Sequence, residues 1–336
     1  RRWVNPDGRE THVDSITHPV NAAFDDFLAK SDRNRPFFVF FNYIDAHLPT
    51  APPQPFLSRF QRHGTRPEEA LRVGLEDWTL YYVGKETTQS DIRILSDLYD
   101  AELAYMSYSI GALLKSLRED GRYDDTLIIV TSDHGEHMGE NGHLGHMMTL
   151  YNTAVRVPLL IKPAGGVEKG RVDDRPGQLV DLFPTVLEAT ETNFEAAELH
   201  GLNLLGSRAT AKRDAIFSEY YYPAQVMELF GAIGISEQEE VLLEPYRRRL
   251  RAIQINARRL IWSSTGDHEL YNLEKDPGEN DNLYSSHPEL ARELLARLEA
   301  AVEKYGGPHA TSNSEASIPD FDEETQDALR ALGYVR

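Results

Sequence analysis

Two continuous apolar runs, each followed at once by polar residues, most constrain how this chain can fold. The run "FFVFF" leads to Asp45 and His47, and the run "LIIV" leads to "TSDHG". An apolar run without polar alternation is typical of a strand that is covered on both faces, as in a parallel sheet. We therefore expect strands at 37–43 and 126–131, with polar side chains just past their carboxyl ends.

A long amphipathic helix is predicted between these two strands. Over residues 98–119, apolar residues recur three and four positions apart, and Gly121 follows as a stop signal. Strand, helix and strand make a unit that crosses over right-handed in a parallel sheet. The sequence thus predicts an α/β fold with a mostly parallel sheet flanked by helices, in which ligands collect at the carboxyl ends of the strands.

The pattern changes beyond about residue 210. Short runs of alternating polarity, "AIFSEYYY", "RAIQINARRLIWSS" and "HELYNL", precede the helical segment "HPELARELLARLEAAVEKY". Alternation with period two is typical of antiparallel strands with one exposed face. We expect an α/β domain at 1–210, a smaller α+β subdomain with an antiparallel sheet and a helix at 211–305, and a linker with a terminal helix at 306–336.

Charge and composition exclude several classes of partner. The chain has 54 acidic and 35 basic residues, a formal net charge of −19, and no cysteine. An acidic surface argues against nucleic acid or an anionic membrane as the main partner. No apolar stretch approaches the roughly 18 residues that a membrane span needs. Without cysteine, this chain has no disulfide, no thiolate metal site and no thiol nucleophile.

The histidines are concentrated in one place. Four of the twelve stand in "TSDHGEHMGENGHLGH", residues 131–146, where glycines allow the backbone to wrap closely around a ligand. A carboxylate and an imidazole at Asp133 and His134 are able to turn toward one divalent cation. The alternative is an aspartate that caps a turn beside an exposed histidine. The chain contains no HExxH, GxSxG, Walker or GxGxxG motif, which weakens ordinary zinc-protease, serine-hydrolase and nucleotide-binding interpretations.

Three segments resemble the sulfatase family of the alkaline phosphatase superfamily. They are "FFVFFNYIDAHLP", "TLIIVTSDHGEHMGENGHLGHMMTLYNTAVRVPLLIK" and "HELYNLEKDPGENDNL". Together with "LVDLFPTVLE" and "LRALGYV", they follow the family's order from about residue 37 to 335, the C-terminal two-thirds of such a protein. The resemblance implies an alkaline-phosphatase-like fold and metal-dependent hydrolysis of a small-molecule or saccharide sulfate ester.

The resemblance also implies roles for individual residues. Asp133 and His134 match half of a site for a divalent cation, usually Ca²⁺, with Mg²⁺ and Mn²⁺ as alternatives. His47 matches the histidine beside the leaving-group oxygen. His146 matches a residue that binds the sulfate and helps to protonate the departing alcohol, so both histidines are predicted to be catalytic and substrate-binding.

Three more polar residues of the same segments are expected either to support these side chains or to face solvent: Asp45, His137 and His143.

The family's nucleophile, a formylglycine made from Cys or Ser in a "C/S-x-P-x-R" motif, has no match in this chain. We expect it in a segment upstream, and we expect the 336-residue chain alone to be an inactive fragment. A phosphomonoesterase, phosphodiesterase or phosphonate hydrolase of the same superfamily is the alternative, and a non-catalytic binding protein is another. Compartment and oligomeric state are not predicted.

Overall fold

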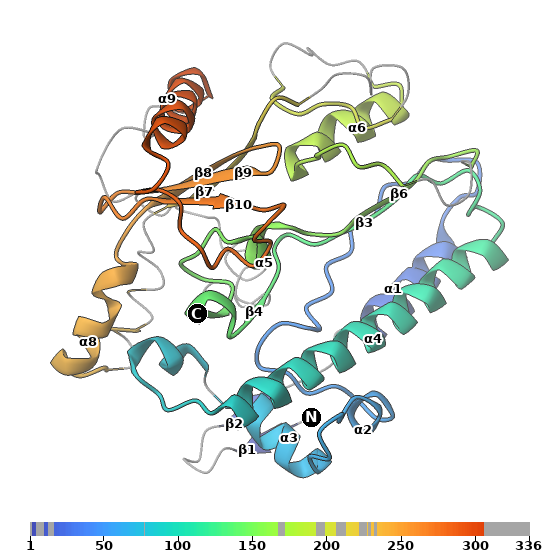
Figure 1. Cartoon of the computed structure of the whole chain (residues 1–336). Coiled ribbons are helices and arrows are strands. Elements are labelled where there is room, and N and C mark those ends of the chain that lie inside the picture. Colours follow the sequence, from blue (N-terminus) through green and yellow to red (C-terminus); the bar gives the residue numbers. More distant parts are fainter. Residues whose placement is uncertain are drawn as a thin grey trace. The chain divides into compact units, whose positions relative to one another are not determined.

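The computed structural model describes most of the chain (Figure 1). The described residues are 2–4, 10–12, 17–76, 78–166, 172–192, 199–205, 213–221, 227, 230–231 and 234–305. They divide into two compact units. One holds the chain up to Trp78 together with 87–120, and the other holds 79–86 and the residues from Gly121 onward. Each unit is described by itself.

The first unit is helical apart from a short hairpin. Its elements are β1 (Arg2–Val4), β2 (Glu10–His12), α1 (Thr17–Lys30), α2 (Phe56–Arg59), α3 (Pro67–Gly74) and α4 (Gln89–Glu119). Helix α4 begins nine residues before the predicted start, because Thr88 and Asp91 form a capping box at its N-terminus. It ends as expected before Gly121, whose φ of +84° suits glycine.

Apolar side chains hold these helices together. Leu57 of α2 and Val73 of α3 are buried with Leu95 and Leu98 of α4, and both short helices pack against α4. The segment between residues 48 and 76 therefore contains two short helices that pack against α4.

The predicted strand at 37–43 is not a strand. Its odd-numbered aromatic residues pack on α1: the rings of Phe37 and Phe27 are 5.7 Å apart, and those of Phe41 and Phe24 are 5.1 Å apart. Phe38 and Phe40 are 78% and 80% exposed. The segment is covered on one side only, and no strand among the described residues pairs with its backbone.

The second unit carries the other chemistry-rich segment. It contains part of η1 (Trp78–Val83), then β3 (Ile128–Thr131), β4 (His137–Met138), η2 (Glu140–Gly142), β5 (Leu144–Gly145), α5 (Asn152–Val155), β6 (Leu159–Lys162), η3 (Leu179–Asp181) and α6 (Leu182–Ala189). Strand β3 confirms the strand predicted at 126–131, and β6 lies beside it. They pair antiparallel, with Val130 opposite Leu160. The predicted parallel crossover from 37–43 to β3 is therefore absent from the described residues, since its first strand does not form.

The predicted antiparallel sheet and helix are confirmed. Four strands lie in the order β10-β9-β8-β7: β7 (Ile216–Tyr220), β8 (Leu250–Ile255), β9 (Arg258–Ser263) and β10 (Glu269–Asn272). Helix α9 (Pro288–Tyr305) packs on β8 and β9 (Figure 1). Leu294 and Leu298 of the helix are buried against Ile253, Leu260 and Leu270 of the sheet. Two further short helices precede β8: α8 (Glu237–Leu243) and η6 (Glu244–Tyr246).

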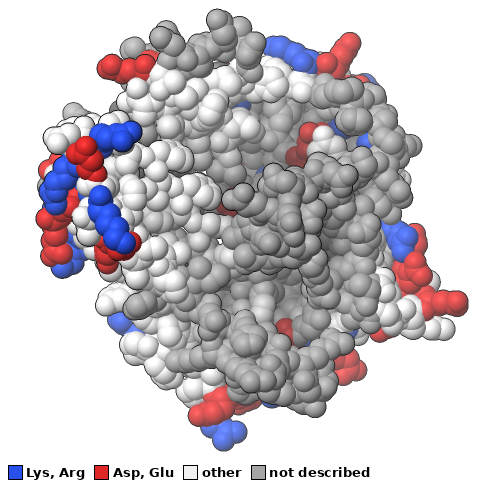
Figure 2. Space-filling view, turned by 180° about the vertical axis from the view of Figure 1, so that it is seen from behind, with Lys and Arg blue, Asp and Glu red and all other residues white. Residues whose placement is uncertain are grey.

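Among the described residues on the face shown in Figure 2, acidic and basic side chains lie next to one another at the margins of the view. Exposed ion pairs of the chain include Lys30–Asp26 at 2.8 Å and Lys115–Glu119 at 2.5 Å. Among the helices that the structure describes, none combines the length and the apolar character needed to cross a bilayer. The predicted linker and terminal helix at 306–336 lie outside the described residues.

Candidate active site

The site begins where β3 ends. Asp133 follows the strand, and the Ser132 hydroxyl donates to the His134 carbonyl oxygen at 2.6 Å, which turns the chain. The Gly135 amide then donates to the Ala154 carbonyl at 2.7 Å. A Cβ atom on Gly135 would lie 2.0 Å from the Thr153 carbonyl oxygen. Only glycine fits at this close approach of two backbones.

A two-stranded hairpin brings the next two residues together. Strands β4 and β5 pair with His137 opposite Gly145, so Glu136 precedes the first strand and His146 follows the second. The Glu136 carboxylate accepts a hydrogen bond from His146 Nδ1, with distances of 3.2 and 3.4 Å to its two oxygens. The register of the hairpin therefore forms this carboxylate–imidazole pair.

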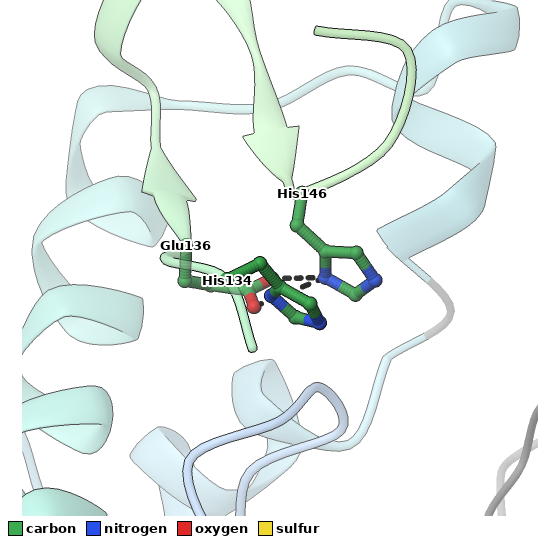
Figure 3. A group of neighbouring side chains, drawn as sticks. All are labelled: His134, Glu136 and His146. Carbon is green, nitrogen blue, oxygen red and sulfur yellow. Dashed lines mark hydrogen bonds and ion pairs between the residues drawn. The ribbon is translucent and has the colours of Figure 1, made fainter. Parts of the chain in front are cut away.

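His134 completes a group of three side chains that point toward one another (Figure 3). The imidazole rings of His134 and His146 stack with their centroids 3.8 Å apart and an interplanar angle of 22°. One potential ligand atom from each of His134, Glu136 and His146 lies within 4.8 Å of the other two. Nitrogen and carboxylate oxygen donors at such spacing suit a divalent cation.

The orientation of His134 favours binding through Nε2. Its Nδ1 atom donates to the Gly135 carbonyl at 3.0 Å, and a hydrogen bond at one ring nitrogen fixes the tautomer that presents the other as a ligand. That Nε2 atom lies 3.7 Å from an oxygen of Asp133, which is 64% exposed. The Glu136 side chain is 5% exposed. The predicted pair Asp133 and His134 thus fits a cation that is approached from solvent.

His137 and His143 lie inside the hairpin. His137 is fully buried and donates from Nδ1 to the Glu140 carbonyl at 3.0 Å. Its ring centroid is 5.3 Å from that of His143. Burial lowers the pKa of both groups, that of His143 to about 4, with the nearby charges of His137 and Arg248 adding to the effect. Both are neutral packing groups at pH 7.

His47 and Asp45 belong to the first unit. His47 is exposed and donates from Nδ1 to the Leu48 carbonyl at 2.5 Å. Asp45 is half-buried in a tight turn whose Ala46 has a φ of 80°. The structure brings together Asp133, His134 and His146. The grouping of His47 with them stays a prediction.

Glu136 was missed by the sequence analysis, which weighed the histidines and treated this carboxylate as part of a loop. A signal was present, because Glu136 stands two residues after His134. In extended chain, residues two apart face the same side.

Comparison with known proteins identifies relatives of this chain. The sulfatase family model matches residues 5–192, and a model described as N-sulphoglucosamine sulphohydrolase, C-terminal, matches residues 139–305. The arylsulfatase of Clostridium perfringens is 24% identical over 329 residues, which cover 90% of this chain and 62% of that protein.

Solved structures show the same fold. A protein in complex with its substrate D-glucosamine-2-N,6-O-disulfate superposes with a TM-score of 0.62 at 17% identity, covering 92% of this chain and 74% of that chain. The phosphonate monoester hydrolase of Agrobacterium radiobacter gives 0.63 at 22% identity, covering 90% and 63%. The expected alkaline-phosphatase-like α/β fold is thereby confirmed. The chain spans about three-fifths of the length of the arylsulfatase.

Proposed function

Because this chain belongs to the sulfatase family, we propose that the protein containing it hydrolyses a sulfate ester, of a small molecule or a saccharide, to an alcohol and inorganic sulfate. The observation that carries the proposal is the group formed by His134, Glu136 and His146 beside the exposed Asp133. In a chain of net charge −19, an anionic substrate requires a local positive site, which a cation held by this group would supply.

Asp133 and His134 would hold the divalent cation of such an enzyme. A bound cation supplies Lewis-acid stabilisation of the charge on the sulfate oxygens. Ca²⁺ is the metal that the family resemblance implies, but Ca²⁺ prefers oxygen ligands, whereas a site with both nitrogen and oxygen ligands also binds divalent first-row transition metals, from Mn²⁺ to Zn²⁺. The imidazole at position 134 therefore makes Mn²⁺ the matched competitor in any binding test.

His146 is the proposed proton donor to the leaving alcohol. Its Nδ1 atom donates to Glu136, which orients the ring. The imidazolium form would bind a sulfate oxygen or protonate the alcohol through Nε2–H. His47 is proposed to act beside the leaving-group oxygen, and Asp45, His137 and His143 to support the reacting groups. The nucleophile, a formylglycine, is proposed to come from a segment outside this sequence.

Phosphonate or phosphate monoester hydrolysis is the second candidate. His134 is compatible with it, because a nitrogen ligand matches metals that serve phosphoryl chemistry as well as sulfuryl chemistry. The structural likeness to a phosphonate monoester hydrolase agrees with this choice.

The test is turnover by the protein that contains this chain, produced together with a formylglycine-generating enzyme. We expect hydrolysis of 4-nitrophenyl sulfate or of a sulfated glucosamine, and a loss of about 10²-fold in rate for His146→Ala, since a positioned acid contributes about that factor. His287→Ala, at an exposed histidine, is the matched control and should keep full activity.

Hydrolysis of 4-nitrophenyl phosphate or of a phosphonate ester, without sulfate release, would select the second candidate. Unchanged activity in His146→Ala would refute the role of that histidine in either reaction.

A further inference from the structure

A buried ion pair in the second unit serves no step of the proposed chemistry. Arg259 of β9 and Glu279 are 3.3 Å apart, Nε to Oε1, and their side chains are 3% and 1% exposed. Removing two charges from water is costly, so a buried ion pair often adds little to the net stability of a protein. Its remaining hydrogen bonds show what else the pair does.

The pair holds the start of α5. The second oxygen of Glu279 accepts from the Asn152 amide at 2.5 Å, and Arg259 Nη1 donates to the Asn152 side-chain oxygen at 3.0 Å. Helix α5 in turn accepts the Gly135 amide at Ala154. A short chain of hydrogen bonds therefore runs from Glu279 to the backbone between His134 and Glu136.

The backbone at the same glutamate also accepts a hydrogen bond from the tip of the hairpin. Asn141, in the turn between β4 and β5, donates from Nδ2 to the carbonyls of Gly278 at 2.9 Å and Glu279 at 3.1 Å. Asn141 and Glu279 both have left-handed backbones, with φ of 55° and 53°. Such conformations persist in residues other than glycine only where surrounding contacts determine them.

We propose that Glu279 and Asn141 form a two-point latch that positions the site. Glu279 secures the base of the hairpin through α5, and Asn141 secures its tip, so that the strand register holds Glu136 against His146. Both are positioning residues, and the inference rests on the proposed function only in taking His134, Glu136 and His146 as the working group.

The latch assigns a structural role to the segment around Glu279. It lies in the α+β part of the chain, more than 130 positions beyond the hairpin, with |i−j| of 138 for the Asn141–Glu279 hydrogen bond. Packing of this part against the hairpin tip would then be a condition for a formed site.

The test replaces Asn141 by aspartate, which has the same shape and tolerates a left-handed backbone but turns an oxygen toward two carbonyl oxygens. In the full-length protein, mass spectrometry should show about tenfold faster hydrogen exchange in peptides covering 133–150, since local opening is then easier. The urea midpoint should change little, because Asn141 is only half-buried, at the tip of a hairpin. Calorimetry should show roughly tenfold weaker Mn²⁺ binding.

Asn256→Asp is the matched control. Asn256 has a φ of 52° in the exposed turn between β8 and β9 and lies outside the latch, so its exchange and Mn²⁺ affinity should match those of the unmodified protein. Asn141→Gly keeps the backbone conformation without the amide donors, and it should also speed exchange.

Exchange in 133–150 that is identical in Asn141→Asp, Asn141→Gly and the unmodified protein would overturn the latch. If the unmodified protein binds no Mn²⁺, the proposed metal site fails, and the exchange measurement still decides the latch.

Discussion

The imidazole rings of His134 and His146 stack with centroids 3.8 Å apart. Two cationic rings at this separation would repel each other by about 4 kcal/mol at an effective dielectric constant of about 20. The stack therefore disfavours two cationic rings. His134, whose Nδ1 donates to the Gly135 carbonyl, is proposed to bind the cation through Nε2, and His146 donates from Nδ1 to Glu136. The two proposed roles are thus divided between the two rings.

The first prediction concerns the cation. Asp133→Asn removes the charged oxygen nearest to His134 Nε2, so calorimetric titration with Mn²⁺ and with Ca²⁺ should show binding weakened at least tenfold, or about 1.4 kcal/mol. Asp267→Asn removes an exposed carboxylate in the β9–β10 turn and should leave the affinity unchanged. Equal affinities in the Asp133 variant and the unmodified protein would remove Asp133 from the metal site.

Gly135 offers a steric test of the same region. Gly135→Ala would place a methyl group 2.0 Å from the Thr153 carbonyl, so the backbone must move and the hydrogen bond to Ala154 must weaken. We expect the free energy of unfolding to fall by about 1–3 kcal/mol, as for other overpacked sites, and metal binding to weaken as well.

Gly111→Ala is the control, and we expect it to change the free energy of unfolding in the opposite direction. Gly111 lies within α4, where a Cβ atom meets nothing within 4 Å, and alanine in a helix interior should stabilise by about 0.5–1 kcal/mol. Urea unfolding should therefore show a lower free energy of unfolding for Gly135→Ala, and a higher one for Gly111→Ala, than for the unmodified protein. A Gly135→Ala protein as stable as the unmodified one would show that the two backbones are not in close contact.

The third prediction concerns Glu102 of α4. Burial raises its pKa to about 7, while the Ala51 amide, which donates to Oε1 at 2.9 Å, opposes the rise. The unfolded chain loses this proton near pH 4.5 and the folded protein near pH 7. Stability from this group is therefore lost as the pH rises through that window, by roughly 3 kcal/mol.

Glu102→Gln keeps the acceptor for Ala51 and cannot ionise. Urea unfolding should find it more stable than the unmodified protein at pH 8, with the difference shrinking toward pH 5. Glu119→Gln, exposed on the same helix, should show no such dependence. If the Glu102 variant follows the same pH curve as the unmodified protein, Glu102 is ionised throughout.

Local patterns predicted the C-terminal sheet well and the segment at 37–43 badly, for one physical reason. Alternating residues in β8 and β9 pair with neighbours a few positions away, so the signal and its cause are in the same stretch. The apolar run at 37–41 forms a strand only if a strand from a distant part of the chain pairs with it. The local pattern of apolar residues does not show whether such a partner strand is present.

The site follows the same rule. The histidines stood out because histidine is scarce and four of the twelve lie close together, and the family resemblance implied the roles of Asp133, His134 and His146. Glu136 is one acid among many, and it joins the site only through the pairing of His137 with Gly145. The ties of Asn141 and Glu279 depend on contacts across the second unit, which no local spacing encodes.

The last prediction concerns His143, whose pH dependence has the opposite sign to that of Glu102. Burial lowers its pKa to about 4, helped by the charges of His137 and Arg248. Three tyrosine rings also surround it, those of Tyr82, Tyr151 and Tyr246. The unfolded chain binds a proton below about pH 6.5 and the folded protein only near pH 4. Stability from this group is therefore complete above pH 6.5 and is lost on acidification through that window, by roughly 3 kcal/mol.

His143→Gln is neutral at every pH and should lose less stability than the unmodified protein between pH 7 and pH 4.5, even if repacking lowers its stability at pH 7. Part of the dependence should remain, because burial lowers the pKa of His137 in the same direction. His287→Gln, at an exposed position, should follow the unmodified protein. Urea unfolding at pH 7 and at pH 4.5 measures how the free energy of unfolding of each protein depends on pH. If this dependence is the same in the His143 variant and the unmodified protein, the hairpin interior admits a charged imidazole.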